Sequence, residues 1–200
     1  MSAFFKRALD VTVAAIALVL LSPLFIAIAL AIRITMGSPV FFRQTRPGRQ
    51  TRRFTIVKFR TMKGDASTVD TSLDAERLTR LGRYLRSLSL DELPQLWNVL
   101  IGDMSLVGPR PLLTEYLQHY TPEQARRHNV KPGMTGWAQI SGRNEVSWAR
   151  KFALDVWYVD HQSFWLDLRI IAMTLWKVLK RKGISQRGHV TTDKFDAGPR

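Results

Sequence analysis

Two adjacent carboxylates, Asp91 and Glu92, stand in the stretch LRSLSLDELPQL and could take part in chemistry. Apolar residues recur at helical spacing over residues 93–101, which predicts a helix that follows the pair and is capped by Gly102. One interpretation is structural, because Ser89 and Glu92 have the spacing of a capping box, and carboxylates at a helix N-terminus stabilise it by about 0.3–1 kcal/mol. The other is chemical, because adjacent carboxylates can supply a nucleophile and a ligand for Mg²⁺.

Arginines accompany this acidic pair in the sequence. Arg86 lies five residues before Asp91, and Arg110 stands between two prolines in GPRPLL. Because proline fixes φ, the backbone of Arg110 is stiff, which suits a guanidinium that must hold phosphate in a bidentate fork. Arg143 in SGRN is a third candidate. Each arginine could instead form a surface salt bridge, but carboxylates among arginines suit phosphoryl transfer, in which the cations spread the transferred charge.

The composition argues against several other chemistries. The chain has no cysteine, which excludes disulfides and cysteine metal sites, and its four histidines are scattered without metal-ligand spacing. Neither a P-loop nor a GxGxxG motif occurs. With 200 residues and a net charge of +14, we expect one domain with a polyanionic partner, for which nucleic acid, anionic lipid and phosphorylated substrates are the candidates.

An uncharged apolar run over residues 11–32 is long enough for a bilayer core of ~30 Å. A cleaved signal peptide fits it poorly, because no small-x-small cleavage site precedes the polar region. Ser22 and Pro23 stand at its midpoint. Pro23 lacks an N–H and its ring crowds the carbonyl of Val19, at a cost of about 3 kcal/mol in a helix interior. We expect the Ser22 hydroxyl to bond one of the freed carbonyls.

The charges that flank this run decide between two membrane arrangements. A kinked spanning helix is the simpler one, since proline is common in such helices. Lys6 and Arg7 precede the run, however, and six arginines follow it within residues 33–53. The positive-inside rule favours the cytoplasm for both flanks, which a single span cannot provide. The sequence therefore predicts a re-entrant helix-break-helix that enters and leaves on one face.

The rest of the chain predicts an α+β fold that is mostly helical. The predicted elements are two short strands around a Pro47-Gly48 turn in residues 38–62, a polar loop over 65–75, a short helix over 76–87, loops over 107–113 and 131–144, and an amphipathic helix from Phe164 with the basic end Lys177, Lys180, Arg181 and Lys182. Such a helix can lie in an anionic membrane surface, and a core-packed helix with a solvated end is the alternative.

These blocks, in their order and spacing, resemble the bacterial sugar transferases, and specifically the small monotopic phosphoglycosyl transferases. The resemblance extends over the whole chain to about residue 180, through KRALD, SPLF, GSPVFFRQTRPG, FTIVKFRTM, LTRLGRYLRSLSLDELPQLWNVLIGDMSLVGPRPLL, KPGMTGWAQISGRN, FALDVWYVD and SFWLDLRI. It implies transfer of a phosphosugar from a UDP-sugar to polyprenol phosphate (undecaprenyl phosphate), with release of UMP, at the first membrane step of glycan assembly.

The resemblance also implies roles for individual residues. Asp91 would be the nucleophile that forms a covalent phosphosugar intermediate and the ligand of Mg²⁺, and Glu92 its partner. Arg86 and Arg110 would hold phosphate, and Arg143 would lie near the nucleotide or the polyprenol phosphate. Ser22 and Pro23 would break the membrane hairpin. Supporting positions in the matching blocks are Lys58, Arg60, Pro111 and Asp167.

From this resemblance we expect a re-entrant hairpin over residues 1–36, a catalytic domain over 37–182 on the cytoplasmic face of the bacterial inner membrane, and a flexible basic tail over 183–200. Membrane lipids would be partners and a homodimer is an option, whereas nucleic acid is not expected as a partner because the apolar run argues against a nucleic-acid binder. The chain departs from the family pattern at Thr51, where a second turn glycine is usual, and at Ala149 and Arg150, where acidic residues are usual. A membrane glycosyltransferase that releases UDP and a non-catalytic membrane adaptor are the alternatives.

Overall fold

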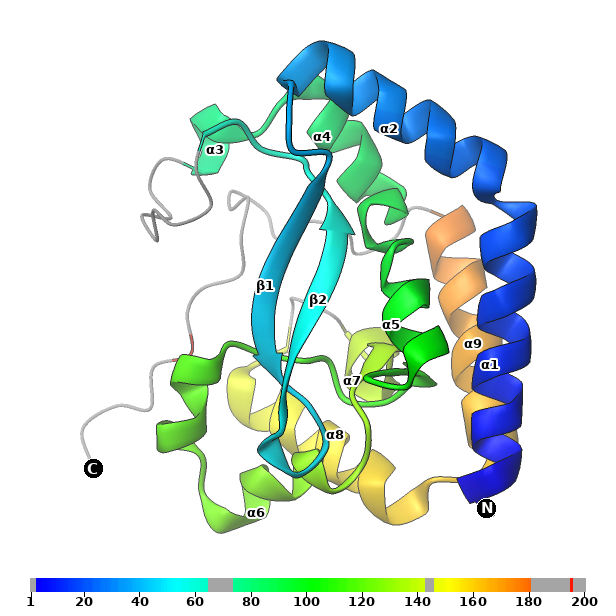
Figure 1. Cartoon of the computed structure of the whole chain (residues 1–200). Helices are drawn as coiled ribbons and strands as arrows, with labels where there is room; N and C mark the ends of the chain where they lie inside the picture. Colours follow the sequence, from blue (N-terminus) through cyan, green and yellow to red (C-terminus); the bar gives the residue numbers. More distant parts are fainter. Residues whose placement is uncertain (1–2, 65–73, 143–145, 181–194, 196–200) are drawn as a thin grey trace.

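A bent pair of helices opens the structure, a computed structural model that describes residues 3–64, 74–142, 146–180 and 195. Helices α1 (Ala3–Leu20) and α2 (Ser22–Met36) bend by 61° at the break between them (Figure 1). The Ser22 hydroxyl donates a 2.8 Å hydrogen bond to the carbonyl of Val19, as predicted. Among the described helices, none has alone the length and apolarity to cross a bilayer, and this pair has them only when its two parts are joined. The predicted helix-break-helix is present as a wide bend.

Helix α1 has one face in the core and one face exposed. Ala14 is fully buried and packs with the main hydrophobic core, whereas Val19 and Leu20 are each 73% exposed. The exposed apolar face continues along α2, where Ile26 and Ile34 are also exposed. Burial in the protein therefore accounts for only half of the apolar run.

The basic residues at the start of α1 bind other elements. Lys6 Nζ lies 2.6 Å from an Asp167 carboxylate oxygen, and Arg7 donates hydrogen bonds of 2.6 and 2.7 Å to the carbonyls of Val99 and Leu100. Both residues were expected to be the positively charged flank that precedes the apolar run. In the structure they instead anchor α1 to the neighbouring helices.

A β-hairpin follows the bent pair, as the Pro47-Gly48 turn predicted. Strands β1 (Phe41–Pro47) and β2 (Arg53–Phe59) are antiparallel, with Phe41 opposite Phe59 (Figure 1). The Asn98 side chain donates a 2.8 Å hydrogen bond to the carbonyl of Thr55 and accepts one of 3.1 Å from the backbone N–H of Val57. The side chain of Asn98 thus joins the helix that follows the acidic pair to the hairpin.

The acidic pair lies on a 3-10 turn, with two short helices before it and one after it. The helix predicted over 76–87 is divided into α3 (Asp74–Arg77) and α4 (Arg80–Ser87), because Thr79 caps α4 by accepting a 2.9 Å hydrogen bond from the N–H of Gly82. The turn η3 (Leu90–Glu92) leads through Pro94 into α5 (Gln95–Ile101), which starts two residues later than predicted and ends at Gly102 as predicted.

The glycine-punctuated stretch over 131–144 was predicted as a loop, and this is wrong in part. It holds strand β4 (Gly133–Thr135) and helix α7 (Trp137–Ile140). Strand β4 pairs in parallel with β3 (Ser105–Val107), and both strands contact the core. Three-residue strands carry too little periodicity for a sequence pattern to reveal them.

The last described helices are α6 (Pro122–Ala125), α8 (Trp148–His161) and α9 (Phe164–Leu179). Helix α9 begins at Phe164, as predicted, and packs one face against the core. Its Ile170 is fully buried in the core, whereas Trp165 and Trp176 are 78% and 59% exposed. Lys177 is not a free basic end, because its ammonium donates a 2.6 Å hydrogen bond to the carbonyl of Ile140.

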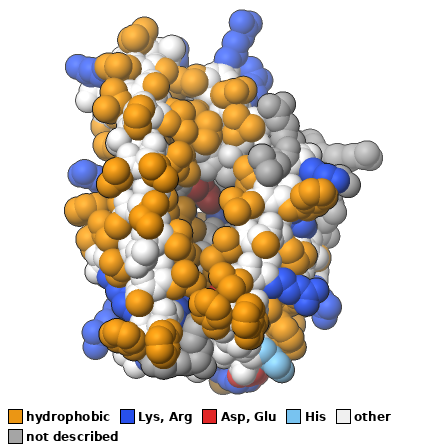
Figure 2. Space-filling view, turned by 90° about the vertical axis from the view of Figure 1, so that its right-hand side faces the viewer, with side chains coloured by type: hydrophobic (Ala, Val, Ile, Leu, Met, Phe, Trp, Pro, Cys, Tyr) orange, Lys and Arg blue, Asp and Glu red, His pale blue; other side chains and the backbone are white. Residues whose placement is uncertain are grey.

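Figure 2 views the side on which α1, α2 and α9 lie, and hydrophobic side chains cover most of it. We call the exposed apolar side chains of these three helices the apolar face; they include Ile16, Val19 and Leu20 on α1, Ile26, Leu30 and Ile34 on α2, and Trp165, Leu175 and Trp176 on α9. The figure also shows a hollow between the apolar columns, with an acidic side chain inside it. Except for Phe195, the predicted tail over 183–200 lies outside the described residues, as does most of the loop predicted over 65–75.

Candidate active site

The acidic pair lies on the 3-10 turn η3 between α4 and α5. Ser89 precedes this turn with a left-handed backbone (φ 56°, ψ 21°), and its side chain caps nothing among the described residues. The predicted capping box is therefore wrong, since a capping serine needs an extended backbone for its hydroxyl to accept the N3 amide hydrogen bond. The capping box, which was the structural alternative to a catalytic role for residues 91 and 92, is therefore absent.

Glu92 is held by two cations from distant parts of the chain. Lys58 Nζ on β2 lies 2.7 Å from Glu92 Oε1, and Arg110 donates from Nη2 to Oε1 at 2.6 Å and from Nη1 to Oε2 at 3.3 Å. Burial of Glu92 opposes its ionisation, but the charges of Arg110 and Lys58 outweigh burial and lower its pKa. Glu92 is a fixed anion.

Asp91 has the opposite environment. No hydrogen bond or ion pair is made by its carboxylate within the described part of the chain. Burial and the neighbouring Glu92 charge raise the pKa of Asp91, and the cations Lys58, Arg86 and Arg110 counteract part of that rise. The pKa values of two adjacent carboxylates are thus shifted in opposite directions. Such a difference commonly indicates that the two groups have different roles in catalysis.

Arg86 reaches the site from the last turn of α4. Its Nε donates a 3.1 Å hydrogen bond to the Thr61 hydroxyl just after β2, and its charge acts on Asp91. A close approach at Gly82 allows this, because a Cβ there would lie 2.0 Å from the carbonyl oxygen of Thr61. The predicted grouping of Arg86 with the acidic pair agrees with this arrangement.

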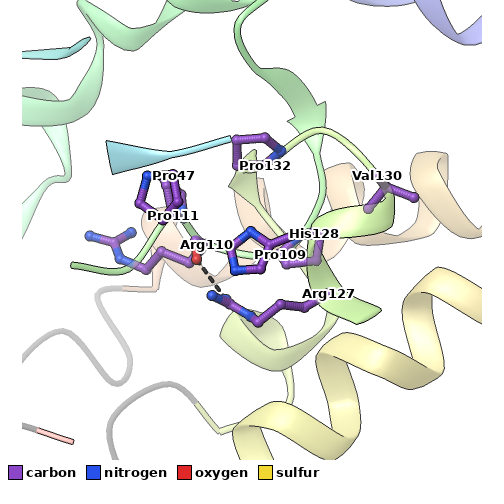
Figure 3. A pocket seen from close by; sticks show the side chains of 8 residues that line it. All are labelled: Pro47, Pro109, Arg110, Pro111, Arg127, His128, Val130 and Pro132. Atoms are coloured by element: carbon purple, nitrogen blue, oxygen red, sulfur yellow. Dashed lines mark hydrogen bonds between the residues drawn. The ribbon is translucent and has the colours of Figure 1, made fainter. Parts of the chain in front are cut away.

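The loop that carries Arg110 is held on both sides. The carbonyl of Pro109 accepts a 3.0 Å hydrogen bond from the N–H of Gly133 on β4, and the carbonyl of Arg110 accepts one of 2.7 Å from Arg127 (Figure 3). Pro111 is buried beside them and lines, with Arg110, a small pocket in the same figure. Neither Asp91 nor Glu92 lines this pocket. We therefore place the chemistry at these two carboxylates, called the dyad below, and not in the pocket.

Three neighbours of Arg110 were missed by the sequence analysis. Arg46, at the end of β1, is half-buried, its Nε makes no hydrogen bond to a described residue, and burial together with the Arg110 charge lowers its pKa to about 10. Arg127 and Asp155 form a buried ion pair behind the Arg110 loop. The prolines around Arg110 marked the loop as rigid, but nothing local in the sequence links it to residues 46, 127 and 155.

The remaining predicted positions fall into three groups. Lys58 belongs to the site, as described above. Arg60 lies beside it in sequence but donates hydrogen bonds to the carbonyls of Met62 and Ser38, at 3.0 and 2.9 Å, so it fastens the hairpin to the end of α2. Asp167 pairs with Lys6 and accepts a 2.7 Å hydrogen bond from Tyr158, away from the dyad contacts. Arg143 lies outside the described residues.

The donor set suits a magnesium ion that is shared with a substrate. No group of three or more acidic, histidine or cysteine side chains that could hold a metal alone occurs within the described ranges. Mg²⁺ usually takes one or two carboxylates, keeps waters and binds substrate phosphates. Asp91, whose carboxylate makes no hydrogen bond to a described residue, offers such an oxygen ligand.

Comparison with known proteins gives a family for this geometry. Residues 1–181 match the family described as Bacterial sugar transferase. A Bacillus subtilis (strain 168) protein named uncharacterized sugar transferase EpsL is 55% identical over 191 residues, which is 95% of each chain.

Longer relatives carry names that state a reaction. The undecaprenyl-phosphate glucose phosphotransferase of Komagataeibacter xylinus is 45% identical over 189 residues, covering 85% of this chain and 35% of the relative. The UDP-glucose:undecaprenyl-phosphate glucose-1-phosphate transferase of Escherichia coli (strain K12) is 41% identical over 183 residues, covering 86% and 39%. This chain therefore spans less than half of the length of these two relatives.

Proposed function

This chain belongs to the bacterial sugar transferase family, and we propose from that premise that it transfers a sugar phosphate from a UDP-sugar to a polyprenol phosphate, with release of UMP. The observation that carries the proposal is that the two adjacent carboxylates have different environments. Glu92 is fixed by Lys58 and Arg110, whereas the adjacent Asp91 is open to a ligand and surrounded by cations. Undecaprenyl phosphate is the acceptor in the names of the two longer relatives.

The proposed reaction has two displacement steps. In the first, an oxygen of ionised Asp91 attacks the phosphorus that bears the sugar, a bond from carboxylate oxygen to phosphorus forms, and UMP leaves with the electron pair of the broken P–O bond. In the second, a phosphate oxygen of the polyprenol phosphate attacks the same phosphorus and Asp91 leaves as a carboxylate. The products are polyprenol-diphosphate-sugar and UMP, and no oxidant or reductant is needed.

The charges around the dyad favour a diphosphate substrate. Lys58, Arg86 and Arg110 carry three positive charges against the two negative charges of Asp91 and Glu92. Because anions repel a carboxylate nucleophile, this excess of cations is what a diphosphate needs before Asp91 can approach it. We assign Arg86 and Arg110 to the phosphates, and Glu92 to holding Lys58 and Arg110 in place.

Magnesium is part of this proposal. The Asp91 carboxylate would hold Mg²⁺ together with the diphosphate oxygens. When bound, the ion neutralises phosphate charge and stabilises the charge that develops on the leaving group.

The apolar face of α1, α2 and α9 suits work at a membrane surface. Its exposed residues have no aqueous role that the fold explains, and the acceptor is a lipid whose phosphate lies at the bilayer surface. We propose that residues 1–36 form a re-entrant element with the Ser22-Pro23 break at its deepest point, and that the rest of the chain works at the cytoplasmic face of the bacterial inner membrane.

A product assay tests the function. The detergent-solubilised protein is given Mg²⁺, undecaprenyl phosphate and one of several UDP-sugars, with UDP-glucose first because both longer relatives carry glucose in their names. Release of UMP that stops with EDTA and returns with Mg²⁺ is the expected result. Release of UDP would contradict the proposal, because it means that the sugar moves without its phosphate.

A further inference from the structure

Arg127 and Asp155 form an ion pair in the protein interior, with side chains only 2% and 6% exposed. Arg127 lies on the 3-10 turn η5 (Arg126–Asn129), and Asp155 lies in the middle of α8. The Nε and Nη2 atoms of Arg127 are 3.1 and 2.8 Å from Asp155 Oδ2. The same Nη2 also donates a hydrogen bond of 2.7 Å to the backbone carbonyl of Arg110 (Figure 3).

Stability alone does not explain a pair of this kind. Removing two charges from water is costly, and buried ion pairs can often be replaced by apolar side chains of similar volume without loss of stability. Burial raises the pKa of Asp155, and the Arg127 charge acts against that rise. An apolar pair could not reproduce the hydrogen bonds of Arg127 to the Tyr120 hydroxyl at 3.5 Å and to the carbonyl of Arg110, nor its cation-π contacts with Tyr120 and Phe152. Of these contacts, the one to the Arg110 carbonyl reaches the loop of the candidate site.

That carbonyl is an important point of attachment for the loop. The peptide group between Arg110 and Pro111 has no N–H, so its plane can be fixed by a backbone hydrogen bond only through the carbonyl oxygen. On the other side of Arg110, the carbonyl of Pro109 is fixed by the N–H of Gly133. The two prolines lock their own φ angles, and the two hydrogen bonds fix the peptide planes on either side of Arg110.

We propose that Arg127, held by Asp155, is a positioning residue that sets the direction of the Arg110 side chain toward Glu92 and the substrate phosphate. The inference rests on the proposed function of Arg110 at the transferred phosphate. Arg127 touches neither the dyad nor the guanidinium of Arg110, and acts through one backbone carbonyl. A shift of about 1 Å in a charged group at a reacting centre can cost roughly 100-fold in rate.

The test removes the ion pair without leaving a buried charge. The variant Arg127→Met with Asp155→Leu keeps apolar volume in the interior, so we expect it to fold with a thermal midpoint close to that of the wild type. Two readouts are then compared: kcat/KM for UMP release, and the affinity for UDP with Mg²⁺ measured by calorimetry, which needs no turnover. We expect kcat/KM to fall roughly 10- to 100-fold, and the affinity for UDP to fall as well.

A variant cycle shows whether the effect passes through Arg110. In an Arg110→Ala background the same double change should have no further effect on the affinity for UDP. An equal loss in both backgrounds, or a folded double variant with wild-type activity and affinity, would overturn the inference and leave the pair a stabilising role.

A second variant covers the case in which the double variant fails to fold. Arg127→Lys keeps a charge for Asp155 but has no planar fork to bond the Arg110 carbonyl at the same time. We expect it to fold and to show the same loss, and wild-type kinetics in this variant would overturn the inference. If the wild-type protein itself neither binds UDP nor releases UMP, the proposed function fails together with the inference that rests on it. If it does both, the variants decide the inference alone.

Discussion

Arg110 donates two hydrogen bonds to the Glu92 carboxylate, from Nη2 to Oε1 at 2.6 Å and from Nη1 to Oε2 at 3.3 Å. Glu92 therefore has a partner that the Asp91 carboxylate lacks among the described residues. Lys58 adds a third contact to the Glu92 carboxylate. The result is a fixed anion directly beside a carboxylate whose pKa burial and that anion raise. Because the two carboxylates differ in this way, the variants Asp91→Asn and Glu92→Gln should differ in activity, in stability and in the pH dependence of both.

Replacing Asp91 with asparagine should abolish turnover and leave the protein at least as stable. We expect UMP release to fall by roughly 10³-fold or more, because the attacking oxygen is lost. A group whose pKa is raised by folding favours the folded state below its unfolded pKa, ordinarily 3.8 for Asp91, and loses that contribution as the pH rises through the folded pKa. Thermal unfolding should therefore show Asp91→Asn gaining stability over the wild type as the pH rises from 3.8 through the folded pKa of Asp91, with no further gain above it. Retained activity would return Asp91 to a structural role.

Replacing Glu92 with glutamine should have the opposite effect on stability. The change leaves Lys58 and Arg110 without their anion, and we expect a loss of about 1–3 kcal/mol in the free energy of unfolding at pH 7. The pKa of Glu92 is lowered by folding from an ordinary 4.5, so its contribution is present above that pH and is lost as the pH falls. Chemical denaturation at pH 7 and at pH 3, well below the ordinary pKa of 4.5, tests this, and an equal loss at both pH values would count against the ion pair.

The activity of the wild type should show an acid limb set by Asp91. Its carboxylate must be ionised to attack, and its pKa lies above the ordinary 3.8, so kcat/KM should fall with decreasing pH before an unperturbed aspartate would protonate. In Glu92→Gln the repelling charge is gone, so the acid limb of whatever activity remains should move to lower pH. A limb that stays in place would mean that another group controls it.

The sequence predicted the parts of this protein that are determined by neighbouring residues. The Pro47-Gly48 turn, the Ser22 hydroxyl bond at the helix break and the start of α9 at Phe164 depend on residues a few positions apart, and all agree with the structure. The prediction of a capping box at Ser89 was local as well, and it was wrong because the backbone there is left-handed. Spacing alone does not reveal such a φ.

The contacts that define the candidate site could not be predicted in the same way. Glu92 meets Lys58 across 34 residues and Arg110 across 18. The glycines at 108 and 133 indicated only turns, yet a Cβ on Gly133 would lie 2.1 Å from the backbone nitrogen of Gly108, so their role is to let two backbones touch. The site residues were grouped through family resemblance and charge, whereas Arg46, Arg127 and Asp155 needed the fold.

The re-entrant arrangement can be tested directly because the chain has no cysteine. Single cysteines are placed at Phe4 and Ser38, which are exposed near the two ends of the bent pair, and at Leu20, which is 73% exposed at the bend. We expect a membrane-impermeant maleimide to label the two end positions in inverted membrane vesicles but not in intact spheroplasts. Leu20→Cys should resist labelling from both sides until detergent is added, since it lies at the greatest depth. Tyr84→Cys on α4, 56% exposed and outside the bent pair, is the matched control for the cytoplasmic domain.

Each arrangement gives a different pattern of labels. Two ends labelled from opposite sides would mean that the bent pair spans the bilayer, and the positive-inside argument would then have failed because Lys6 and Arg7 are bound within the protein. Labelling of Leu20→Cys from the aqueous phase would mean that the pair lies on the surface without entering the lipid. Only same-sided ends with a protected bend agree with an enzyme that reaches a lipid phosphate from one face of the membrane.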